Sequence, residues 1–94
     1  MPEVHFRVRW PDGGLDTCYS PSTVIKDFFV AGQAYPLDEF LQRSRSGLNA
    51  ASERVRALYG MSCSRALGQL AAIEAKAKSQ PTEGASVLVE AFSA

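Results

Sequence analysis

The feature that most constrains this chain is the stretch from Leu37 to Tyr59, whose apolar positions recur every three or four residues. The row consists of Leu37, Leu41, Ser44, Leu48, Ala51, Val55 and Leu58. This spacing predicts an amphipathic helix with one buried face. Asp38 and Glu39 put negative charge in its first turn, where the helix dipole favours it, and Gly60 can take the left-handed conformation that ends a helix. Such a helix would be about 35 Å long, so the rest of a small domain must pack along it.

A second helix is predicted from Ser62 to Lys78, directly after the first. Its apolar row is Cys63, Ala66, Leu67, Leu70 and Ile73. Because almost no linker separates the two helices, we expect an antiparallel helical hairpin in which this row faces the first helix.

A β-hairpin is predicted at the start of the chain, because Val4, Phe6, Val8 and Trp10 alternate with His5, Arg7 and Arg9. Asp12-Gly13 is a preferred pair for a two-residue turn, and this turn sets Trp10 opposite Leu15, Val8 opposite Thr17 and Phe6 opposite Tyr19. In this register Arg9 faces Asp16 and Cys18 lies on the polar face.

The remaining segments complete an α+β fold. Pro21 to Phe29 is predicted to form a short helix, with a strand as the alternative, and Phe28 and Phe29 should be buried in either case. A breaker cluster from Gln80 to Gly84 precedes an apolar run, Val87 to Phe92, which we expect to join the hairpin as a third strand. The predicted fold is therefore one domain, residues 1–94, with a small antiparallel three-stranded sheet packed on a long two-helix hairpin.

Composition limits the classes of function. Ten basic and ten acidic residues give a formal net charge of zero, which does not favour a nucleic-acid binder. No apolar run is long enough to span a membrane, and residues 1–10 lack the apolar centre of a signal peptide, so we expect a cytoplasmic protein. Two cysteines do not make a disulfide framework, and we expect neither a metal nor another cofactor. A long helix and two open sheet edges favour a homodimer.

Cys63 is the first candidate for chemistry, with Arg65 two residues further on. If Ser62 caps the helix, the thiol lies in the first turn, where the helix dipole and a nearby cation promote the thiolate. The alternative, which we favour, is that Cys63 only packs in the apolar row. His5 is the single imidazole that could serve as its base.

Basic residues form the other candidate sites. On the long helix, Arg43 and Arg54 lie at one edge of the apolar face, and Arg45 and Arg56 lie at the other. Guanidinium groups in this arrangement can bind phosphates or carboxylates, but they are more often a solvated flank. His5, Arg7 and Arg9 form a basic stripe on the strand, without the exposed aromatic residues of single-strand binders, so nucleic-acid binding is a minor alternative.

Five segments in order carry a family resemblance: Arg9-Trp10-Pro11-Asp12-Gly13, Cys18-Tyr19-Ser20-Pro21-Ser22, Gly32-Gln33 with Tyr35-Pro36, Arg43-Ser44-Arg45, and Cys63-Ser64-Arg65-Ala66-Leu67. Up to about Ala77 the chain resembles the small bacterial nitrogen-starvation-response proteins encoded in nitrilase-containing gene clusters. The resemblance implies a link with nitrogen limitation and with nitriles or cyanide as a nitrogen source, and neighbours that include a nitrilase, a radical-SAM protein and an acetyltransferase. It supplies no catalytic residues.

Two functions from different classes follow. The favoured one is a non-catalytic accessory or partner-binding protein, whose partners include proteins encoded in the same cluster. The alternative is a small enzyme or carrier that uses the thiol of Cys63.

Overall fold

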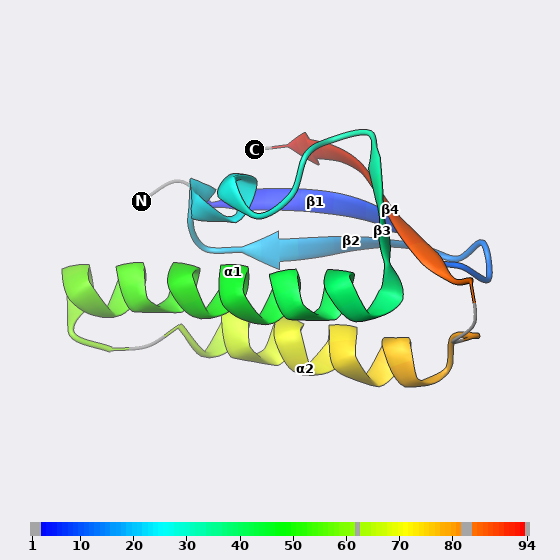
Figure 1. The fold of residues 1–94 in the computed structure, drawn as a ribbon. Coiled ribbons are helices and arrows are strands. Elements are labelled where there is room, and N and C mark those ends of the chain that lie inside the picture. Colours follow the sequence, from blue (N-terminus) through cyan, green and yellow to red (C-terminus); the bar gives the residue numbers. More distant parts are fainter. Residues whose placement is uncertain (1–2, 62, 82–83, 94) are drawn as a thin grey trace.

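Four antiparallel strands, two α-helices and a 3-10 helix make up the fold in the computed structural model, which describes residues 3–61, 63–81 and 84–93. In chain order the elements are β1 (Val4–Arg9), β2 (Leu15–Ser20), the 3-10 helix η1 (Thr23–Asp27), β3 (Gln33–Pro36), α1 (Leu37–Tyr59), α2 (Ser64–Lys78) and β4 (Ser86–Ser93). The strand order is β2-β1-β4-β3. Figure 1 shows both α-helices on one side of this sheet. The predicted α+β class is confirmed.

The bounds predicted for α1 are confirmed at both ends. At the start, the N–H of Leu37 donates to the carbonyl of Ala85 at 3.1 Å, because the preceding Pro36 offers no side-chain cap. At the end, Gly60 adopts a φ of 81° and donates its N–H to the carbonyl of Arg56 at 2.7 Å. The predicted burial of Leu58 was wrong, because its side chain is 60% exposed. The last turns of α1 extend past the end of the sheet, so no strand covers them (Figure 1).

The second helix begins slightly later than predicted, at Ser64, with Cys63 as its N-cap residue. The predicted cap, Ser62, lies outside the described residues. In the predicted apolar row, Ala66 and Ile73 are buried, whereas Leu67 is 44% exposed.

The register of the first hairpin differs from the prediction by one residue. Phe6 faces Cys18 and Val8 faces Asp16. The reason is Pro11, which has no N–H for a ladder position but suits the second position of a turn that begins at Trp10. The N–H of Gly13 donates to the carbonyl of Trp10 at 2.8 Å, which closes this turn one residue earlier than Asp12-Gly13 alone would do. Every side chain of β2 therefore changes face.

The sheet has four strands, so the predicted three-stranded sheet was wrong. The additional strand, β3, is four residues long and ends in Pro36, and neither property indicates a strand. It lies at an edge of the sheet, where a proline is tolerated, and it pairs with β4. The C-terminal strand predicted from Val87 to Phe92 is present as β4, but it pairs with both β1 and β3.

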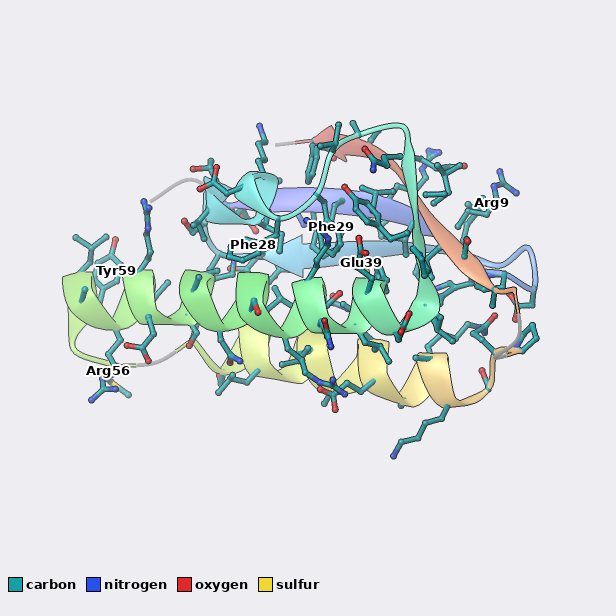
Figure 2. All side chains as sticks on the ribbon, viewed as in Figure 1. Arg9, Phe28, Phe29, Glu39, Arg56 and Tyr59 are labelled. Carbon is teal, nitrogen blue, oxygen red and sulfur yellow. The ribbon has the colours of Figure 1, made fainter. Side chains whose placement is uncertain are left out.

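The short helix predicted from Pro21 to Phe29 is present as the shorter η1. Its cap is Ser22, whose Oγ accepts the N–H of Val24 at 3.2 Å. Phe29 is buried as predicted, and Phe28 is half-buried. Figure 2 shows both rings beside α1.

Aromatic rings join the sheet to α1 in the core. Trp10 packs edge to face on Phe40 with ring centroids 5.4 Å apart, and Phe29 lies 5.3 Å from Phe40. Trp10 is 2% exposed, and its indole N–H donates to Asp16 at 2.7 Å. Its burial agrees with its place in the alternating apolar row of the first strand. Within the described residues, no helix has the length and hydropathy that a membrane span requires.

Candidate functional site

A cluster of reactive and cationic side chains forms where α2 begins beside β2. The Arg65 guanidinium carbon lies 4.0 Å from the centroid of the Tyr19 ring, and the His5 ring lies 5.9 Å from it at 62°. Cys63 is half-buried, and its backbone N–H donates to Ser52 Oγ at 3.3 Å. Burial raises the pKa of Tyr19, the adjacent Cys63 adds to this effect, and Arg65 opposes it. The structure thus brings together Cys63, Arg65 and His5.

Tyr19 is the member of this cluster that the sequence prediction missed. The predicted register placed it on the core face opposite Phe6, whereas the observed register pairs it with His5 on the other face. Its backbone N–H donates to Gln69 Oε1 at 3.0 Å, which fixes this part of β2 to α2. The preference of Pro11 for a turn was the sequence signal that could have identified it.

Cys18 does not belong to this cluster. It lies on the core face, not on the polar face as predicted, and it is 1% exposed. Burial, followed by the charge of Asp16, raises the pKa of its thiol to about 12. Both cysteines are free. Among the described residues, no group of three or more His, Cys, Asp or Glu side chains could hold a metal ion.

The four arginines of α1 do not form one site. Arg43 holds the segment after η1, since its Nη1 donates to the carbonyl of Phe28 at 2.9 Å and its guanidinium lies 5.0 Å from the Tyr35 ring. It also pairs with Glu39, four residues earlier on α1, at 3.0 Å. Arg45 pairs with a glutamate of α2, and Arg56 pairs loosely with a glutamate one turn earlier on α1. Arg54 has no ion pair among the residues that the structure describes.

The predicted basic stripe lies on the sheet face that the helices leave open. Glu90 lies within it, 3.8 Å from Arg7 Nε and 3.0 Å from Arg9 Nε. A register shift between Arg7 and Val8 leaves Glu90 as an extra residue of β4, between the partners of these two residues. His5 is 4.0 Å from Glu3. The two carboxylates offset much of the positive charge, so the stripe is a weak site for nucleic acid.

Two large side chains are exposed at the end of the helical hairpin where α1 meets α2. Tyr59 and Met61, here called the tip cluster, are 67% and 75% exposed. Leu67, one turn into α2, is 44% exposed. Figure 2 shows Tyr59 at the end of α1 that extends past the sheet. The apolar row had predicted that Leu67 would be buried.

A cavity of about 620 Å³ lies at the opposite end of the helices, where α1 begins and α2 ends. Apolar side chains line it, together with Asp38, Lys78 and the ion pair between Arg45 and Glu74 at 3.1 Å. The sequence prediction missed this cavity, because it depends on how β4 joins the ends of both helices.

The fold and these surfaces define a small α+β protein in which a helical hairpin covers one face of a four-stranded antiparallel sheet and exposes an apolar tip. The model of one protein family, described as nitrogen starvation-induced protein NitG, matches residues 5–92. The chain belongs to this family, and the resemblance to nitrogen-starvation-response proteins is confirmed. No curated protein and no solved structure gives a significant match.

Proposed function

We propose that this protein is a non-catalytic accessory protein of a bacterial nitrogen-limitation response, and that it acts in the cytoplasm by binding a protein partner. Its family supports the physiological setting. The tip cluster supports the mode of action, because neighbouring exposed apolar side chains can form a surface that binds a partner.

The tip cluster is the observation that carries this proposal. Met61 is 75% exposed and Tyr59 67%, whereas Phe6, Phe40 and Leu48 in the core are fully buried. Methionine adapts to irregular partner surfaces, and tyrosine gives a large contact area with a polar tip. An apolar groove or an amphipathic helix of a partner would fit such a surface.

The resemblance to nitrilase-cluster proteins suggests where the partner is encoded. We expect it among the products of the same gene cluster, such as the nitrilase, the radical-SAM protein or the acetyltransferase. The protein would then assist or regulate the use of nitriles or cyanide as a nitrogen source.

Co-purification from nitrogen-starved cells tests this proposal. The wild-type protein should retain a partner that Met61→Asp loses, because a carboxylate cannot enter an apolar contact without a large desolvation cost. Val30→Asp is the matched control, since Val30 is also exposed (60%) but lies on the segment after η1. A partner retained equally by both variants, or no partner with the wild-type protein, would contradict the proposal.

The cluster of Cys63, Tyr19, Arg65 and His5 favours a second candidate, an enzyme or carrier that uses the Cys63 thiol. Labelling with a charged electrophile at neutral pH separates the two functions, in a Cys18→Ala background. The accessory function predicts that Cys63 labels no faster in the native protein than in the unfolded protein. Faster native labelling would indicate an activated thiolate and support the second candidate.

A further inference from the structure

One side of the C-terminal half of α1 carries a shallow hollow of about 550 Å³. Its lining, here called the α1 groove, consists of Ala50, Glu53, Arg54, Ala57 and Leu58. These positions are three or four residues apart and so lie along one side of the helix. Gly47 lies on this same side one turn earlier, where Ile25 and Phe28 pack closely against it. The groove is thus the continuation of a helix face that η1 covers only at its start.

We propose that the α1 groove binds a second copy of this chain, with the two α1 helices antiparallel and a twofold axis between Glu53 and Arg54. In this register Glu53 faces the partner's Arg54, and the reverse contact follows by symmetry. Ala50 faces the partner's Ala57. A twofold interface must be self-complementary, and this face meets that requirement in both charge and size.

The charges of the groove are available for this contact. Arg54 has no ion pair among the described residues, although Arg9, Arg43 and Arg45 each have one. Within the described part of the chain, Glu53 pairs with Arg56 alone, at 3.6 Å, and both side chains are more than 60% exposed. Such a surface pair contributes little free energy and can give way to a better one. Around the twofold axis the four charges would alternate in sign.

The apolar part of the groove gives the contact its area. Packed helices usually have their axes about 8–10 Å apart, and small alanine side chains at facing positions allow a distance near the lower limit. Leu58, which is 60% exposed in the single chain, would be covered at the side of the contact. Since one pair of helices buries less than a standard interface of about 800 Å² per partner, we expect a dissociation constant on the order of 10 µM.

The edges of the sheet offer less to a second copy than the sequence suggested. At the β2 edge, the N–H of Tyr19 is already bonded to Gln69. At the β3 edge, the strand is only four residues long and ends in Pro36. Short strands, proline and covering side chains are the devices that prevent pairing between edges. This leaves the α1 groove as the better place for the contact.

Sedimentation of charge-reversed variants tests the proposal. At 100 µM, which is about ten times the expected constant, the wild-type protein should sediment mainly as a dimer, with twice the mass of the 10.2 kDa chain. Glu53→Arg and Arg54→Glu should each sediment as monomers, because each places four like charges around the twofold axis. A 1:1 mixture of these two variants should recover the dimer mass, because one copy then carries two positive charges and the other two negative ones.

Two further variants keep the test decisive. Ala57→Gln keeps a good helix former but fills the groove, and it should also give monomers. Gln42→Arg, on an exposed part of α1 outside the groove, should leave the dimer unchanged. A monomeric wild-type protein at 100 µM, a dimer unaffected by the groove variants, or a mixture that stays monomeric would each overturn the proposal. The result is independent of the proposed function, because the groove contains no residue of the tip cluster.

Discussion

Ser44 is a buried hydroxyl in the centre of the molecule that the structure leaves unsatisfied. It is 0% exposed, and its Oγ has no hydrogen-bond partner among the described residues. A buried polar group without a partner costs about 1–3 kcal/mol. The same helix carries a useful contrast, since the Oγ of the buried Ser52 accepts the N–H of Cys63.

Ser44→Ala should therefore stabilise the protein, by about 1 kcal/mol, because it removes an unsatisfied hydroxyl and adds a better helix former. Ser52→Ala, the matched control, should destabilise it by about 0.5–1.5 kcal/mol, because the Cys63 N–H loses its acceptor. Urea unfolding at pH 7 measures both changes. Equal effects of the two substitutions would show that the Ser44 hydroxyl does have a partner.

Cys18 should make stability depend on alkaline pH. Burial and the charge of Asp16 raise the pKa of its thiol from 9.0 to about 12. Between these values the unfolded chain loses the proton while the folded chain keeps it, so stability is complete below pH 9 and falls as the pH rises. The slope from this group approaches ~1.4 kcal/mol per pH unit.

Urea unfolding at pH 7, 9 and 10.5 should therefore show a steeper loss for the wild-type protein than for Cys18→Ala. The raised pKa of Tyr19 acts in the same direction in both proteins and cancels in the comparison. Parallel pH profiles would contradict the prediction.

At the scale of elements, the contact between η1 and α1 depends on Gly47. A Cβ at this position would lie 2.6 Å from Ile25 Cδ1 and 3.2 Å from Phe28 Cδ2. Ile25 is fully buried and can move only at the expense of its neighbours. At Gly68 in α2, by contrast, nothing lies within 4 Å of an added Cβ.

Gly47→Ala should therefore destabilise the protein by roughly 1 kcal/mol, because overpacking costs more than the gain in helix propensity. Gly68→Ala should stabilise it by about 0.5–1 kcal/mol, since only the propensity term acts there. Thermal unfolding of the two variants measures the difference. A stabilised Gly47→Ala protein would mean that η1 packs loosely on α1.

Sequence periodicity predicted the helices better than the sheet. The bounds of α1 follow from one apolar row, two acidic residues and Gly60, which are local signals. The strand β3 and the register of β2 were missed, because both depend on the structural context of a proline. Pro36 is tolerated because β3 is an edge strand, and Pro11 shifts the register because it lies in the turn that begins at Trp10. Because the predicted register of β2 was wrong by one residue, Tyr19 and Cys18 were predicted on the wrong faces of the sheet.

The candidate sites were predictable only in part. The sequence indicated Cys63 and Arg65, but the contact of Arg65 with Tyr19 needs the approach of α2 to the edge of β2. The exposure of Leu58 at the end of α1 was missed for a different reason. The apolar row of α1 continues beyond the length of the sheet, and periodicity alone does not say where a covering strand ends.

At the scale of the whole molecule, the single tryptophan should report on every layer of the fold. Trp10 contacts Phe40 of α1 and donates to Asp16 of β2, so neither the helices nor the sheet can separate without changing its surroundings. We expect native fluorescence emission typical of a buried indole, and unfolding by urea in one cooperative step.

The fluorescence transition of Trp10 and the far-ultraviolet dichroism transition of the helices should have the same midpoint. Helices that persist after the tryptophan becomes exposed would show instead that the hairpin of α1 and α2 is stable on its own.

The position of β4 has a consequence for how the protein is made. This strand is the last element in chain order, yet it lies between β1 and β3, and β3 pairs with no other strand that the structure describes. During translation, the first hairpin and both helices leave the ribosome before Ser86 to Ser93 can follow. A stalled or truncated nascent chain that ends before Ser86 would expose two unpaired backbone edges, which favour aggregation and attract chaperones and proteases. The sheet therefore closes only around a chain whose synthesis has reached β4.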